Sequence, residues 1–170
     1  MWNPETINLG TGMRSWGGAP PITPRRGWIR PPNPHKWLEA PYHAEHTSFN
    51  TTFIMSKDQL DCAALNPLQF AADDTVLAVR LNHHQLQVPQ DQGYWKLASL
   101  EVPVSVGLFV AGENVLHFDL LNRGGSGGLL VQGAVRLECL PPPAPPPWHA
   151  EKVRACMSRG HFALGAGEQT

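Results

Sequence analysis

Apolar and polar residues alternate along several short stretches in the middle of the chain, with the period of two that is typical of β-strands buried on one face. The alternation runs through residues 49–55, 75–82, 114–122 and 129–139. No long stretch shows the sustained 3.6-residue period of an amphipathic helix. Several short strands at this spacing predict an all-β fold, an antiparallel jelly-roll-like β-sandwich.

The apolar positions of these stretches should point into the core, because side chains on one face of a strand recur at every second residue. Turn-forming residues separate the stretches, among them Asp73-Asp74, Asn82-His83-His84 and the glycine-rich run from Gly124 to Gly128. The predicted core residues are Leu77, Val79, Leu81, Leu116, Phe118, Leu120, Val131 and Val135.

The prolines divide the chain into three parts. Of 17 prolines, eight lie in residues 1–41 and six in residues 141–147. Proline lacks the backbone donor that helices and sheets need, so it concentrates where regular structure is absent. We therefore expect an extended arm over residues 1–41, the sandwich over residues 42–140 and a linker and tail over residues 141–170.

The two flanking parts differ from ordinary disordered tails in their tryptophans and their charge. They contain five of the six tryptophans, whereas disordered segments are usually poor in aromatic residues. They hold eight basic and four acidic residues, against five basic and ten acidic residues in 42–140. We expect them to pack on a domain surface, either their own or that of a neighbouring subunit. The predicted partner-binding residues are Trp2, Trp16, Trp28, Trp37, Arg25, Arg26, Arg30 and Trp148.

Composition argues against several classes of protein. The formal net charge of −1 disfavours a dedicated nucleic-acid binder. The apolar runs are too short for a membrane-spanning helix, which needs about 20 apolar residues. The first residues lack the basic start and apolar stretch of a secretory signal, so we expect synthesis in the cytoplasm and leave the final location open.

The three cysteines, Cys62, Cys139 and Cys156, are too few and too scattered to predict a disulfide framework or a zinc cluster. We expect Cys62 and Cys139 to behave as small apolar residues in or beside strands. Cys156 is then the unpaired cysteine of the tail. This usage predicts folding in a reducing compartment.

Two histidine pairs are candidate ligands for zinc or copper, His43 with His46 and His83 with His84. A metal site needs a third ligand in matching geometry, which the sequence does not supply. Adjacent side chains in a turn also tend to point in different directions. We predict solvated turn histidines, with no metal and no cofactor.

No motif of an enzyme is present. There is no Gly-x-Ser-x-Gly elbow, and the glycine-rich loop over residues 122–128 lacks the lysine that follows a phosphate cradle. Asp73-Asp74 are candidates for acid–base chemistry or calcium binding, but capping of a turn explains them without either, and we expect this role. We therefore expect no acid, base and nucleophile to converge in one cleft.

Tyr94 and Trp95 are the best ligand candidates, because they follow the turn of residues 90–93 and should lie near an end of the sandwich. An aromatic face can stack on a sugar ring while nearby polar groups supply hydrogen bonds. The alternative is that Trp95 is a core or interface residue.

The order of these elements resembles the galactose-binding-like jelly-roll sandwiches over about residues 28–140. One departure is Asn82-His83, where that family often has Asn-Gly. The resemblance implies a non-catalytic module that binds through variable loops, and it carries over no ligand residue. The matching segments, in order, are Trp28-Ile29, Tyr42 with residues 51–53, residues 70–74, 79–82 and 112–118, and Asn122 with residues 127–131.

Two hypotheses of function follow. The first is a non-enzymatic structural or binding subunit of a larger assembly, for example a phage decoration or tail protein, whose arm contacts neighbouring subunits. A chain without residues 1–27 would then fold but assemble poorly. The alternative is a carbohydrate-binding module that recognises a glycan or a cell surface through Tyr94 and Trp95.

Overall fold

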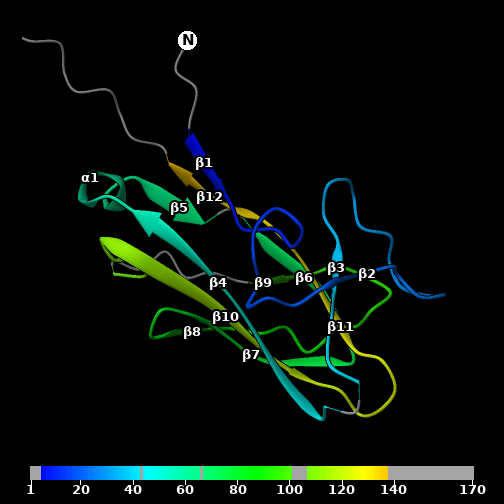
Figure 1. The fold of residues 1–170 in the computed structure, drawn as a ribbon. Helices are drawn as coiled ribbons and strands as arrows, with labels where there is room; N and C mark the ends of the chain where they lie inside the picture. The colour runs from blue at the N-terminus through cyan, green and yellow to red at the C-terminus, as the bar shows by residue number, and fades with distance from the viewer. Residues whose placement is uncertain (1–4, 43, 66, 101–106, 138–170) are drawn as a thin grey trace, which may run out of the picture. The chain divides into compact units, whose positions relative to one another are not determined.

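The computed structural model describes residues 5–42, 44–65, 67–100 and 107–137, and the regular secondary structure of these residues is almost entirely β-strand (Figure 1). One short helix, α1 (Lys57–Leu60), follows the longest strand of the first half of the chain. The strands are β1 (Glu5–Asn8), β2 (Pro21–Ile22), β3 (Trp37–Glu39), β4 (His46–Met55), β5 (Ala63–Leu65), β6 (Leu68–Asp73), β7 (Thr75–Leu81), β8 (His84–Leu86), β9 (Ala98–Leu100), β10 (Gly112–Leu121), β11 (Gly128–Gln132) and β12 (Ala134–Leu137).

The strands form three antiparallel sheets. The first has the order β4-β10-β7-β8, the second β2-β3-β11-β6-β9 and the third β1-β12-β5. Figure 1 shows β4, β10 and β7 side by side, in agreement with their pairing. The all-β, sandwich-like prediction is therefore confirmed.

The second and third sheets are consecutive parts of one bent ladder. Only Gly133 separates β11 from β12. β11 pairs with β6, and β12 pairs with β5, which directly precedes β6 in the chain. Gly133 has a φ of 149°, and a Cβ there would lie 2.8 Å from the Cδ1 atom of Leu68. Glycine is needed at this bend because other residues rarely adopt such a backbone conformation.

The core lies between this bent ladder and the four-stranded sheet. Along β4 the burial alternates as the sequence predicts, with Phe49, Thr51, Phe53 and Met55 buried and the residues between them exposed. Seven of the eight predicted core residues are buried, namely Val79, Leu81, Leu116, Phe118, Leu120, Val131 and Val135.

The prediction for Leu77 is wrong, because this side chain is 47% exposed. The register between β7 and β10 shifts at Asp119 and Leu120, so that Leu120 pairs with Val76 and Leu77 has no partner in the ladder. This β-bulge turns the next side chain inward, and Val76 is buried in place of Leu77.

Residues 5–41 are part of the sandwich and not a separate arm. β1 pairs with β12, and β3 pairs with β11 and with β2. Beyond β1 the ladder continues, since the backbone N–H of Thr11 donates to the carbonyl oxygen of Val131 over 2.9 Å. The boundary expected at residue 41 is therefore not a structural boundary. The expected linker and tail over residues 141–170 lie outside the described residues.

The expectation for Cys62 is also wrong, because this cysteine is disulfide-bonded. Cys139 and Cys156 lie outside the described residues. Since disulfides persist mainly in oxidising compartments, the bond removes the basis for expecting a reducing one.

Candidate functional site

The outer face of the five-stranded sheet carries a second apolar cluster, made of Trp28, Trp37, Ala71 and Leu130. The two indole rings pack with their centroids 4.3 Å apart. Trp37 Nε1 donates to the carbonyl oxygen of Ile29 over 2.9 Å. The sheet is therefore buried on both faces, and the chain that leads to β3 forms the outer cover.

Three of the predicted partner-binding tryptophans are core residues of their own chain. Trp16, Trp28 and Trp37 are each at most 7% exposed. Trp16 packs edge-on against Phe118, with ring centroids 5.8 Å apart. We correct the prediction for these three, because side chains buried in this way leave no surface for a partner. Trp2 and Trp148 lie outside the described residues.

The predicted arginines, in contrast, lie on the surface. Residues 23–31, which we call the arginine loop, surround a hollow of about 660 Å³. Arg25, Arg26 and Arg30 line it, and their side chains are exposed. Within the part of the chain that the structure describes, none of the three forms an ion pair. The hollow therefore presents unneutralised positive charge.

Trp28 fixes the arginine loop to the sheet beneath it. Its backbone N–H donates to the carbonyl oxygen of Arg25 over 3.0 Å, and its Nε1 donates to Asp73 Oδ2 over 2.9 Å. Burial and the neighbouring Asp74 raise the pKa of Asp73 to about 6, against the opposing effects of Trp28 and Arg25. One carboxylate thus lies close enough to affect Arg25 electrostatically without pairing with it.

Tyr94 and Trp95 lie beside the arginine loop. The backbone N–H of Ile29 donates to the carbonyl oxygen of Tyr94 over 2.7 Å, and a Cβ on Gly27 would lie 3.7 Å from the Tyr94 ring. The Trp95 ring stands edge-on to Tyr94 at 5.0 Å and is 57% exposed. The fold therefore joins two sets of predicted site residues that are more than 60 positions apart in the sequence.

This surface combines exposed guanidinium groups with an exposed indole ring. Guanidinium groups bind carboxylate, phosphate or sulfate oxygens, frequently through two parallel hydrogen bonds. An indole face packs on apolar or sugar rings. The arrangement can bind an acidic partner, and the three arginines and Trp95 are the residues that would contact it.

The other sequence candidates do not gather at this surface. His46, His83 and His84 are exposed, and His43 lies outside the described residues. His84 Nε2 is 2.9 Å from the carbonyl oxygen of Gly107. Among the residues that the structure describes, no group of three or more histidine, cysteine or acidic side chains could hold a metal ion.

Asp74 accepts a backbone hydrogen bond, but from a distant loop and not within the turn that the sequence predicts the Asp73-Asp74 pair to cap. Its Oδ2 accepts a hydrogen bond of 2.6 Å from the backbone N–H of Arg123, at the start of the glycine-rich loop. Gly124 and Gly125 there have positive φ angles of 144° and 81°. The loop connects β10 to β11, so the prediction of a connection between two strands is confirmed.

Sequence reasoning missed one polar cluster, on the outer face of the four-stranded sheet. Ser48 Oγ donates to Asp119 Oδ1 over 2.7 Å, and His117 Nε2 and Arg80 Nη2 lie 2.7 and 2.6 Å from the same carboxylate. Burial raises the pKa of Asp119, but Ser48, His117 and Arg80 together bring it below its ordinary value. These residues come from three strands, which is why no local motif indicated them.

A carboxylate, a histidine and a serine thus do meet, although not in a catalytic order. The serine hydroxyl donates to the carboxylate and not to the imidazole, whereas an activated nucleophile is hydrogen-bonded to its base. The cluster also lies on a sheet face and does not line the hollow of the arginine loop.

Within the described ranges, no helix is long and apolar enough to cross a membrane. Comparison with known proteins adds no further constraint on the site, since no family model, no curated protein and no solved structure matches this chain.

Proposed function

We propose that this chain is a non-enzymatic binding subunit of a larger assembly, which attaches to an acidic partner surface through Arg25, Arg26 and Arg30. The observation that carries the proposal is the set of three exposed guanidinium groups that line one hollow without an ion pair. The identity of the assembly, including the phage particle considered from the sequence, stays a prediction.

The anchoring of the arginine loop supports a role in binding. Trp28 is buried and makes hydrogen bonds to both Arg25 and Asp73, so the backbone between the arginines is held in place. A loop that is ordered before binding loses less conformational entropy when its partner arrives. Positive charge that is left unpaired also favours encounter with a negatively charged surface.

The experiment uses a fluorescently labelled polyglutamate peptide as an acidic probe of the full chain. In fluorescence anisotropy at low salt, the triple variant Arg25→Gln, Arg26→Gln, Arg30→Gln should bind about tenfold or more weakly, since exposed ion pairs contribute up to about 1 kcal/mol each. A matched control removes three exposed cations elsewhere, with Lys36→Gln, Lys57→Gln and Arg123→Gln.

The control should keep most of the affinity of the unmodified chain. Equal losses in both triple variants would mean that net charge alone drives binding, and the proposal would fail. It would also fail if the unmodified chain bound no polyglutamate at low salt.

A glycan is the second candidate partner, and the exposure of Trp95 favours it. A sulfated or uronic-acid glycan would place anionic groups on the arginines and a sugar ring on the indole. In this case heparin should bind more tightly than polyglutamate of similar charge, and Trp95→Ala should weaken only heparin binding. Equal behaviour of the two probes would exclude the glycan. The resemblance to galactose-binding-like sandwiches stays a prediction.

A further inference from the structure

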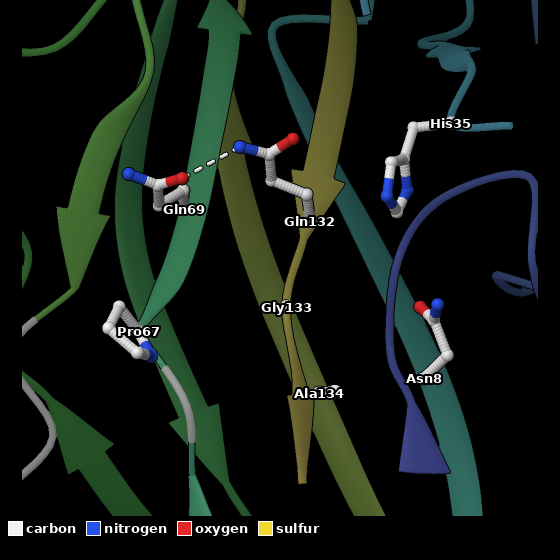
Figure 2. A pocket seen from close by; sticks show the side chains of 7 residues that line it. All are labelled: Asn8, His35, Pro67, Gln69, Gln132, Gly133 and Ala134. Carbon is white, nitrogen blue, oxygen red and sulfur yellow. Dashed lines mark hydrogen bonds between the residues drawn. The ribbon is translucent and has the colours of Figure 1, made fainter. Parts of the chain in front are cut away.

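A second hollow, of about 560 Å³, lies where the bent ladder opens between its two parts (Figure 2). Gly133 bends the strand on one side, and Pro67 on the other side has no backbone N–H to donate. Direct strand pairing resumes only at Gln132 with Gln69 above the bend and at Val135 with Leu65 below it. The gap in the ladder is the physical origin of the hollow.

Four polar side chains line this hollow together with Pro67 and Ala134, and none of the lining residues carries a carboxylate, ammonium or guanidinium group. Asn8, His35, Gln69 and Gln132 supply its polar atoms, and we call it the amide hollow. Figure 2 shows the amide group of Asn8 directed toward the His35 ring. Gln132 lies on the opposite side of the hollow from these two residues. Its chemistry therefore differs from that of the arginine loop.

The two glutamines form an ordered chain of hydrogen bonds across the sheet. Gln132 Nε2 donates to Gln69 Oε1 over 2.7 Å (Figure 2). Gln69 Nε2 in turn donates to Ser99 Oγ over 3.2 Å. This direction leaves Gln132 Oε1 without a partner among the described residues. Hydrogen bonds that run in one direction polarise one another, which strengthens a free acceptor at the end of the chain.

Asn8 supplies the complementary donor, and the His35 ring lies beside it. Asn8 Oδ1 accepts from the backbone N–H of Gly10 over 2.8 Å, so its NH₂ group remains able to donate. The His35 ring lies directly over Gly10, where a Cβ would come within 2.3 Å of Nδ1. That Nδ1 atom is buried and has no hydrogen-bond partner in the described part of the chain. Because Nδ1 is covered by the protein itself, the His35 ring is a wall of the hollow and offers it no hydrogen bond at this atom.

We propose that the amide hollow binds an uncharged, hydroxyl-rich ligand, with the size of one or two sugar rings. Adjacent hydroxyl groups both donate and accept, so they can donate to Gln132 Oε1 and accept from Asn8 Nδ2. A charged ligand would find no counter-charge in the lining. The volume lies within the range of about 300–1,000 Å³ that is usual for small-molecule sites. This site is independent of the arginine loop.

The test titrates the full chain with galactose, N-acetylglucosamine, maltose and glycerol, followed by isothermal titration calorimetry and amide NMR shifts. At least one of the three saccharides should bind and shift resonances of Asn8, Gln69 and Gln132. Gln132→Leu removes the free acceptor, and Ala134→Leu fills the hollow without touching a polar group. Each variant should weaken binding about tenfold or more.

Two controls separate this site from the rest of the molecule. Gln85→Leu changes an exposed glutamine in β8, on the other sheet, and the triple arginine variant changes only the charged surface. Both should bind the saccharide as the unmodified chain does. The proposal is overturned if no saccharide binds at millimolar concentration, or if folded Gln132→Leu and Ala134→Leu variants both bind normally. Binding of glycerol as tight as that of the sugars would restrict the ligand to a simple polyol and overturn the sugar-sized assignment.

Discussion

Trp28 Nε1 donates a 2.9 Å hydrogen bond to Asp73 Oδ2, and this contact joins the arginine loop to the last residue of β6. The carboxyl group of Asp73 has a pKa of about 6, chiefly because burial disfavours its charged form, while the bond from Trp28 acts in the opposite direction. One hydrogen bond therefore positions the loop and also affects the protonation of the acid behind it.

Replacement of Trp28 by phenylalanine should break this link while keeping an aromatic ring in the apolar cluster. We expect a loss of about 1–3 kcal/mol in the free energy of unfolding, because a buried acceptor loses its donor. The pKa of Asp73 should rise further. Urea denaturation and an NMR titration of the Asp73 carboxyl carbon measure the two effects. Trp95→Phe is the control, and an unchanged Asp73 pKa in Trp28→Phe would contradict the prediction.

The stability of the chain should depend on pH through Asp73. Its pKa is about 6 in the folded chain and 3.8 as the ordinary value, so between these pH values the folded state holds a proton that the unfolded state has released. Stability should therefore fall as pH rises from about 4 to about 6. Above that range Asp73 should cause little further change in stability. Asp73→Asn should remove this dependence in urea unfolding midpoints. If Asp73→Asn kept the full dependence of the unfolding midpoint on pH, other titratable groups would be its cause and the prediction would be wrong.

The β-bulge at Leu77 predicts opposite results for two adjacent residues. Val76→Ala should cost about 1–3 kcal/mol, because Val76 is buried, whereas Leu77→Ala should stay within about 0.5 kcal/mol. Chemical denaturation of both variants measures the difference. A larger loss for Leu77→Ala would mean that the regular alternation continues through this strand and that the bulge is absent.

Truncation of residues 1–27 should unfold or strongly destabilise the chain, contrary to what the proline pattern predicts. The deletion removes β1 and the buried side chains of Leu9 and Trp16. Trp16→Ala alone should cost about 3–5 kcal/mol, as for other large core residues. Circular dichroism during thermal unfolding tests both variants, with Trp95→Ala as the exposed control. A truncated chain that melts at the normal temperature would show that this segment is dispensable.

The disulfide of Cys62 should contribute to stability. Cys62→Ser, or reduction of the purified chain with dithiothreitol, should lower the free energy of unfolding by about 2–5 kcal/mol. Mass spectrometry after alkylation without reductant should find Cys62 unlabelled. Quantitative alkylation of Cys62 under these conditions would show that the thiol is free, and its replacement by serine should then have little effect.

Much of the fold follows from the sequence because a half-buried strand imposes a period of two on its side chains. The alternation in β4 and β10 identifies both strands and their buried faces, including Phe53 and Phe118. Local chemistry also indicates the turns, since Gly124 and Gly125 of the loop between β10 and β11 have the positive φ angles that glycine adopts most readily. These features depend on neighbours along the chain.

Only the tertiary structure decides the rest, because it depends on pairings between distant residues. Prolines around β2 and β3 suggest an arm, yet these strands are short edge or near-edge elements in which proline is tolerated. The register shift that exposes Leu77 exists only between two paired strands. The same holds for the candidate sites. Each arginine or glutamine is an ordinary surface residue in the sequence. A hydrogen bond between Ile29 and Tyr94 brings the arginine loop beside Tyr94, and the antiparallel pairing of β6 with β11 brings Gln69 against Gln132.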